Sequence, residues 1–161
     1  MAASKEQAKE YQVKAVYLYN FSHFIHWPKN LLELKTEFNI CVLGDNPFSS
    51  ALDYVVSTEK FHGNPIKVHY LETVVDAHIC QILFISQSER NQLNTILDYL
   101  DKQPVLTVSD IAEFIEHGGM IKFYMNRKHQ VRLAIDPDTL READLEADAN
   151  LLRISQIMSR K

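Results

Sequence analysis

Cysteine and glycine are both scarce in this sequence of 161 residues, which contains two cysteines and four glycines. The motifs C-x-x-C and G-x-S-x-G are missing, which argues against a thioredoxin-like redox enzyme and a serine hydrolase. Half of the glycines stand together at Gly118-Gly119, between a predicted helix and a predicted strand. A phosphate-binding glycine loop has the opposite order, so we expect a left-handed helix end and a tight turn into a hairpin here.

An excess of positive charge and long apolar runs are also missing. The 17 basic and 21 acidic residues give a net charge of −4, so no basic surface indicates binding of nucleic acid. The longest uninterrupted apolar runs, Ile40 to Leu43 and Ile82 to Ile85, are far shorter than the roughly 20 residues that span a bilayer. The sequence shows no secretion leader pattern. We expect a globular domain without a membrane anchor.

Histidine is plentiful, with seven residues, but its spacing does not predict a metal site. His23 and His26 share a helix face, yet no carboxylate or thiol lies within a turn to complete a tetrahedral ligand set. The other five are scattered, so exposed or hydrogen-bonded imidazoles are expected. We predict no metal, no cofactor and no catalytic residue.

The strongest pattern in the sequence is an aromatic helix that must end before Trp27-Pro28. Residues 11–24 contain five aromatic rings. The 3.6-residue period of a helix places the following side chains on one side: Val13, Val16, Tyr17, Asn20, Phe21 and Phe24. We expect the helix to begin near Ser4, in a capping box with Gln7, and to dock along its whole length. Tyr17, Phe21 and Phe24 are expected in the core. Tyr19 and Trp27 are candidates for an exposed contact patch, because the helix is aromatic on more than one side.

Apolar strands alternate with helices through the middle of the chain. The pattern predicts strands at residues 38–44, 66–70, 80–86 and 105–108, with helices beginning at Pro47 and covering Leu93–Leu100 and Ile111–Glu116. Residues 121–125 and 131–135 then alternate apolar and polar side chains around a turn, which predicts an antiparallel hairpin. Asp136-Pro137 restarts a helix, and a final helix is marked by Leu151, Ile154 and Met158.

This order of elements predicts the fold class. We expect an α/β fold with a mostly parallel central sheet flanked by helices on both faces, flavodoxin- or Rossmann-like, and a C-terminal antiparallel hairpin. No linker or repeat divides the chain, so residues 1–161 are predicted to form a single domain. Residues 1–10 are expected to be flexible or partly foreign to the natural chain.

Polar residues follow the predicted strands at the edge where α/β sheets bind ligands. Asp45, Ser86, Ser109 and Asp110 therefore form a candidate ligand crevice. A different interpretation is favoured: Ser86 with Glu89, and Asp110 with Glu113, fit capping boxes of the helices that follow. The paired acids of a phospho-acceptor site are missing from the end of the first strand.

Cys41 and Cys80 lie near the starts of two strands that are neighbours if the order is flavodoxin-like, 2-1-3-4. They are a candidate disulfide. The alternative is two buried thiols that act as small apolar residues.

Six segments in succession resemble the YfiR family, and they extend over most of the chain. They are YLYNFSHFIHWP at 17–28, ICVLGDNPF at 40–48, CQILFIS at 80–86, LTVSD at 106–110, GGMIKF at 118–123 and VRLAID at 131–136. The resemblance implies a non-enzymatic periplasmic regulator whose signal peptide is absent from this chain. It would bind the periplasmic domain of an inner-membrane diguanylate cyclase, YfiN-like, and hold synthesis of cyclic-di-GMP low. An outer-membrane YfiB-like protein would sequester it.

The resemblance also bears on the cysteines and on assembly. In the oxidising periplasm Cys41 and Cys80 would form a disulfide, whereas the second, late cysteine pair of some relatives is missing here. A homodimer is expected. Our leading hypothesis is repression by protein contact, and the alternative is a periplasmic small-molecule-binding sensor with the crevice above as its site. A flavodoxin-like enzyme ranks last.

Overall fold

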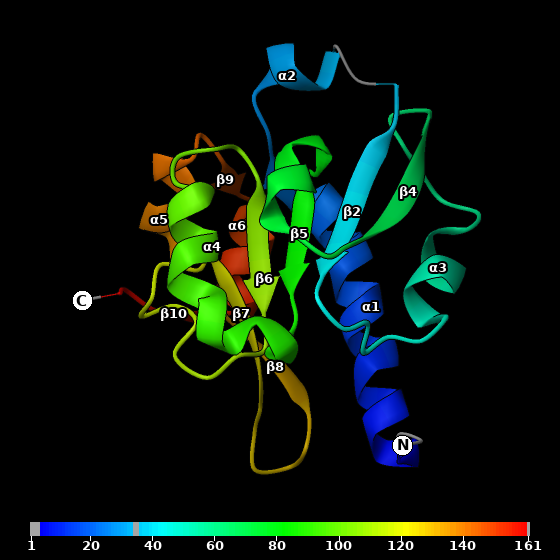
Figure 1. Cartoon of the computed structure of the whole chain (residues 1–161), viewed down its shortest axis with the longest axis vertical. Coiled ribbons are helices and arrows are strands. Elements are labelled where there is room, and N and C mark those ends of the chain that lie inside the picture. Colours follow the sequence, from blue (N-terminus) through cyan, green and yellow to red (C-terminus); the bar gives the residue numbers. More distant parts are fainter. Residues whose placement is uncertain (1–3, 34–35, 161) are drawn as a thin grey trace.

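The centre of the fold is an eight-stranded sheet with the strand order β10-β8-β7-β6-β5-β2-β4-β3 (Figure 1). The computed structural model describes residues 4–33 and 36–160. The strands of the large sheet are β2 Phe38–Leu43, β3 Lys60–Phe61, β4 Asn64–Leu71, β5 Ile82–Ile85, β6 Leu106–Ser109, β7 Ile121–Met125, β8 Val131–Ile135 and β10 Gln156–Ile157. A second, two-stranded sheet pairs β1 Ile25–His26 with β9 Glu146–Ala147 in antiparallel orientation.

Helices cover both faces of the large sheet. They are α1 Lys5–Phe24, α2 Lys29–Glu33, α3 Ala51–Val56, α4 Leu93–Tyr99, α5 Pro137–Glu142 and α6 Ala149–Ile154, with 3₁₀ segments η1 Val74–Ile79 and η2 Gln87–Gln92. Figure 1 shows α1 passing behind the central strands and α4 in front of them. Among the described residues, no helix is long and apolar enough to cross a membrane.

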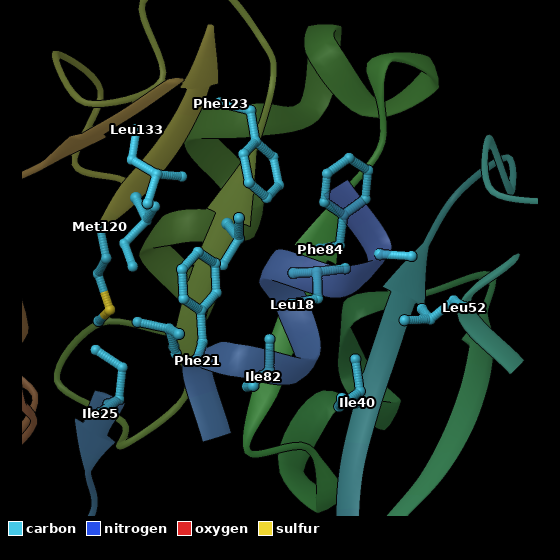
Figure 2. Packing of buried hydrophobic residues seen from close by; sticks show 14 of the residues in the cluster. Leu18, Phe21, Ile25, Ile40, Leu52, Ile82, Phe84, Met120, Phe123 and Leu133 are labelled. Carbon is cyan, nitrogen blue, oxygen red and sulfur yellow. The ribbon is translucent and has the colours of Figure 1, made fainter. Parts of the chain in front are cut away.

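The predicted fold class is confirmed. The four central strands lie in the order β4-β2-β5-β6, which is the flavodoxin-like order, and they are parallel to one another. The hairpin of β7 and β8 is antiparallel, as the alternation predicts. Both faces of β2 and β5 are buried because their side chains alternate between two cores. Ile40, Ile82 and Phe84 belong to the α1 side, where Figure 2 shows them near Leu18 and Phe21, and Leu83 belongs to the α4 side.

Helix α1 is rotated about its axis relative to the prediction. Ser4 caps the helix as expected, with its Oγ accepting a hydrogen bond from the Gln7 backbone N–H at 3.0 Å. The residues toward the sheet are Tyr11, Lys14, Ala15, Leu18, Phe21 and Ser22. Val13 and Val16 are 43% and 45% exposed instead. Phe21 is buried, whereas Tyr17 and Phe24 pack against the core from its margin.

The segment predicted to be flexible or partly foreign, residues 1–10, overlaps the start of α1, and its flexibility stays a prediction. Lys5 to Glu10 form the first turns of the helix. The start of that predicted segment, residues 1–3, lies outside the described residues.

Three other helix predictions are corrected by the structure. Helix α3 begins at Ala51 rather than at Pro47, because the Asn46 side chain accepts a hydrogen bond from the Phe48 N–H and holds a turn there. Residues 111–116 form turns, since Glu113 has a left-handed φ of 66° that interrupts a helix. The last helix ends at Ile154, and the chain then joins the sheet as β10, parallel to β8.

Gly118 adopts the predicted left-handed conformation, with a φ of 107°, at the turn into β7, but it follows turns rather than the predicted helix. Gly119 is required for another reason. A Cβ atom there would lie 2.2 Å from the Phe114 ring, so only glycine fits against this buried side chain.

Candidate functional site

The four residues of the predicted crevice all lie at the carboxyl edge of the sheet, but the structure gives them different surroundings. Asp45 is exposed, and its backbone N–H donates to Ser88 Oγ at 2.9 Å. Ser86 and Ser109 are buried. The Ser109 hydroxyl donates to the Ile85 carbonyl at 2.6 Å and accepts from the Ile111 N–H at 3.1 Å, so it links β5 to the chain after β6.

The capping boxes predicted for two of these residues do not form. Ser86 stands at the N-cap of η2 without a side-chain cap hydrogen bond. Asp110 is followed by turns rather than by a helix. Its carboxylate is directed instead to α1, where it has partners that the sequence analysis did not anticipate.

A buried cluster of charges joins α1 to Asp110. The Lys14 side chain is 2% exposed, and its ammonium group lies 2.8 Å from Asp110 Oδ2. Glu10, one turn earlier on α1, also pairs with Lys14. The Asp110 side chain is 8% exposed and accepts a further hydrogen bond from Gln87 Nε2 at 3.0 Å. Each buried charge therefore has an opposite charge and additional polar partners, the condition under which such burial is tolerated.

Tyr11 completes this cluster. Its hydroxyl donates to Asp110 Oδ2 at 2.6 Å, and its ring lies under the Lys14 ammonium at 4.4 Å from the ring centre. Burial, followed by the hydrogen bond to Asp110, raises the pKa of Tyr11 well above its ordinary value of 10. Tyr11 therefore stays protonated at neutral pH and remains a hydrogen-bond donor.

The role of this cluster is structural rather than ligand-binding. A shallow pocket beside it is lined by Glu10, Tyr11, Lys14, Gln87, Asp110 and Lys122 among others, and Asp45, Ser86 and Ser109 are not among its lining residues. Lys14 and Asp110 already neutralise each other, so neither presents a free charge to a ligand. We interpret the cluster as a set of contacts that hold Tyr11 and Lys14 toward the sheet. They fix the rotation of α1 about its axis, and Val13 and Val16 therefore face outward.

Two grooves with apolar residues in their lining flank this outward side of α1. We call the first the α1–α3 groove. It has a volume of about 550 Å³, and its lining includes Val16, Tyr11, Phe48, Tyr54 and Val55. Tyr54 is one of the most exposed large side chains described.

We call the second the α1–hairpin groove, and its volume is about 820 Å³. Its lining comes from the N-terminal half of α1 and from the hairpin of β7 and β8: Ser4, Glu6, Gln7, Lys9, Glu10, Val13, Tyr17, Met125, His129, Gln130, Val131 and Arg132. Val13 and Val16 are three residues apart on α1 and so are neighbours on the helix surface. The exposed side of α1 thus connects the two grooves.

Of the contact patch predicted from the sequence, the exposure of Trp27 is contradicted, and the role of Tyr19 stays a prediction. Trp27 is 5% exposed and packs edge-to-face on Phe38, with ring centres 5.2 Å apart. The chain folds back after α1 and buries this ring, although its Nε1 has no hydrogen-bond partner among the described residues. Tyr19 is half-buried, and its hydroxyl donates to Glu59 at 2.7 Å. The large apolar residues that α1 exposes are Val13 and Val16, which the period of the helix reveals once Lys14 is assigned to the buried side.

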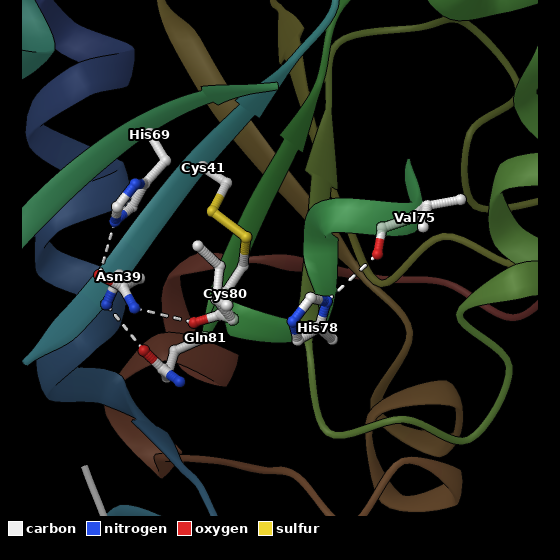
Figure 3. Close-up of a disulfide and its surroundings, with 8 residues drawn as sticks. Asn39, Cys41, His69, Val75, His78, Cys80 and Gln81 are labelled. Carbon is white, nitrogen blue, oxygen red and sulfur yellow. Dashed lines mark hydrogen bonds between the residues drawn. A yellow bond between two sulfur atoms is a disulfide. The ribbon is translucent and has the colours of Figure 1, made fainter. Parts of the chain in front are cut away.

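Cys41 and Cys80 form a disulfide that joins β2 to the end of η1 (Figure 3). Both residues are buried. Both belong to the apolar cluster on the α4 side, and a polar network adjoins them, because Asn39 lies two residues before Cys41 and hydrogen-bonds His69, Gln81 and the Ile79 carbonyl. No group of three or more potential metal ligands occurs in residues 4–33 and 36–160.

A family model described as YfiR/HmsC-like matches residues 11–156 of the chain. The match extends from the first buried residue of α1 to β10, so it includes Tyr11, Lys14 and Asp110 of the charge cluster, the disulfide and both strands of the hairpin. Comparison with curated proteins finds no match.

Proposed function

Because the chain belongs to the YfiR/HmsC-like family, whose members regulate diguanylate cyclases and are periplasmic and generally non-enzymatic, we propose that it represses an inner-membrane diguanylate cyclase by direct contact. The partner is the periplasmic domain of a YfiN-like cyclase. A YfiB-like outer-membrane protein relieves the repression by binding the regulator, which acts as a homodimer. The disulfide of Cys41 and Cys80 is in keeping with a site of action outside the cytoplasm.

The observation that carries this proposal is the outward side of α1. Val13 and Val16 are exposed although α1 is otherwise anchored along the sheet, and grooves with apolar lining residues adjoin them on both sides. Exposed apolar surface next to a recessed, polar-rimmed groove is typical of protein interaction sites.

Repression by contact requires a difference in affinity between two states of the cyclase. The regulator shifts the cyclase toward the inactive conformation by binding that conformation more tightly. A 100-fold preference shifts the equilibrium by about 2.7 kcal/mol, which is sufficient to suppress a lightly populated active state. No chemistry in the regulator is needed.

Deletion of the gene in its host is expected to raise cyclic-di-GMP, measured by mass spectrometry of cell extracts. Complementation with the wild-type gene restores the low level, whereas Val13→Asp/Val16→Asp does not, because two carboxylates replace the apolar contact on α1. Val75→Asp/Tyr99→Asp is the matched control, since both side chains are exposed on elements of the opposite face. Unchanged cyclic-di-GMP after deletion contradicts the proposed function.

A second candidate function, a periplasmic small-molecule sensor, is favoured by the α1–α3 groove. Its volume lies within the range of about 300–1,000 Å³ that is usual for ligand pockets, and three aromatic rings line it. A ligand at about 100 times its Kd stabilises the folded state by about 2.7 kcal/mol. A thermal-shift screen with amino acids, nucleotides and small aromatic compounds is expected to find a stabilising compound whose effect Tyr54→Ala removes. The absence of any shift contradicts this candidate.

A further inference from the structure

Positive charge is concentrated around the α1–hairpin groove, although the chain as a whole has a net charge of −4. Lys9 and Arg132 line the groove, and Lys5, Arg127 and Lys128 stand on the two elements that form it. Within residues 4–33 and 36–160, none of these five cations makes an ion pair. The groove lining includes two carboxylates, Glu6 and Glu10, which do not balance these five cations, although Lys14 only partly offsets Glu10 because it also pairs with Asp110.

The rim of the groove is held in place rather than loosely attached. The Arg132 guanidinium donates to Gln130 Oε1 at 2.7 Å and to the Val131 carbonyl at 3.1 Å, and both acceptors are neutral. The Asn126 side chain closes the hairpin tip by accepting from the N–H groups of Lys128 and Gln130. Arg132 is therefore oriented without being neutralised, which leaves its charge available to a partner.

The floor of the groove is apolar. Val13 and Met125 are exposed there, and Tyr17 and Val131 lie beside them. Figure 1 shows the N-terminal end of α1 and the tip of the hairpin projecting at the same end of the molecule, beyond the sheet. The α1 wall runs from Ser4 to Tyr17, which corresponds to roughly 20 Å along the helix axis. Another helix of about 14 residues has this length.

An apolar floor with a basic rim favours a binding partner that has both apolar and acidic side chains. We propose that the α1–hairpin groove binds an acidic amphipathic helix of a protein partner, with apolar side chains on Val13 and Met125 and carboxylates toward Lys9 and Arg132. This deepens the proposed function, on which it rests, by naming the surface that the cyclase occupies. An anionic lipid surface fits less well because the groove lies between two elements, and a nucleic acid backbone has no apolar side chains to place on Val13 and Met125.

The test uses the full chain and synthetic helical peptides of about 14 residues, titrated by calorimetry at low and at high salt. One peptide has leucine on one face and glutamate elsewhere, and a second has lysine in place of glutamate. We expect the acidic peptide to bind, the basic peptide not to bind, and added salt to weaken binding. In Lys9→Glu/Arg132→Glu the affinity for the acidic peptide should fall by about tenfold or more, because two attractive charges become repulsive.

Lys29→Glu/Lys67→Glu is the matched control, since it changes the net charge equally at exposed residues outside the groove. Circular dichroism checks that each variant is folded, and Lys9→Glu/Lys128→Glu, at two exposed positions, replaces the first variant if Arg132→Glu unfolds the protein. No binding of the acidic peptide, equal binding of both peptides, or equal loss in the control overturns the proposal. Binding only to phosphatidylglycerol vesicles also overturns it.

Complementation in the host separates this inference from the proposed function. If deletion raises cyclic-di-GMP and the Lys9→Glu/Arg132→Glu gene restores the low level fully, repression stands and the groove is not its site. If deletion leaves cyclic-di-GMP unchanged, repression of the cyclase fails, while the peptide titration still decides what the groove binds.

Discussion

Replacing Lys14 by methionine is expected to lower the free energy of unfolding by about 3–5 kcal/mol, measured by urea denaturation followed by circular dichroism. The substitution keeps most of the side-chain volume and removes the ammonium group that lies 2.8 Å from Asp110. Asp110 then keeps the Tyr11 hydroxyl and Gln87, but its buried negative charge has no cation. The cost is therefore that of an uncompensated charge rather than of a lost contact.

The double variant Lys14→Met/Asp110→Leu distinguishes this explanation from a packing defect. Because the second substitution removes the stranded charge, the double variant should be more stable than the sum of the two single effects predicts. The surface pair of Arg141 and Asp138 is the matched control, since both partners are mostly exposed and Arg141→Ala should cost less than about 1 kcal/mol. Additive single and double effects at Lys14 and Asp110 contradict the model of a coupled buried pair.

Loss of the disulfide is expected to have an effect of similar size. The bridge spans 39 residues of sequence, and closing a loop of that length in the unfolded chain corresponds to about 4 kcal/mol at 25 °C. Cys41→Ala/Cys80→Ala should lower the free energy of unfolding by about that amount, because both side chains are buried and no charge is introduced. Urea denaturation curves give the comparison.

A reducing agent provides the control for the disulfide. Wild-type protein unfolded and refolded with dithiothreitol should lose about the same stability as the double variant, and the double variant should not respond to dithiothreitol at all. A wild-type denaturation midpoint that is the same with and without reductant would show that the bridge contributes nothing in solution.

The central sheet could be predicted from the sequence because each of its strands is indicated by the residues of one short segment. Segments such as Ile40–Leu43 and Ile82–Ile85 are apolar at every position, which indicates strands buried on both faces, and helices between them require parallel order. The hairpin could also be predicted, because apolar and polar residues alternate in Ile121–Met125 and in Val131–Ile135, on either side of a turn. The family resemblance, carried by six segments, is confirmed by the match over residues 11–156.

The rotation of α1 could not be predicted in the same way. Lysine is normally exposed, so a pattern-based assignment places Lys14 on the outer side and brings Val13 and Val16 to the core. Its burial depends on Asp110, which is 96 residues away in sequence and becomes a partner only after the sheet has formed. The same limit applies to β1, β9 and β10, whose two-residue strands carry no pattern and exist through their distant partners.

The candidate site was affected by the same limit. Asp110 lies at the carboxyl edge, as its place after a predicted strand indicates, but its contacts with α1 come from residues 96 and 99 positions away in sequence and could not be predicted. Trp27 is predicted to be exposed because the aromatic residues of this segment lie on more than one side, whereas the fold buries it.

The burial of Trp27 has an optical consequence. It is the single indole of the chain and lies against the Phe38 ring at the start of β2, close in sequence to the end of α1. Because its Nε1–H has no acceptor among the described residues, its emission should be blue when this junction is closed and shift to the red when water enters. The protein thus contains an intrinsic reporter, which records loosening where the long helix meets the sheet without any added label.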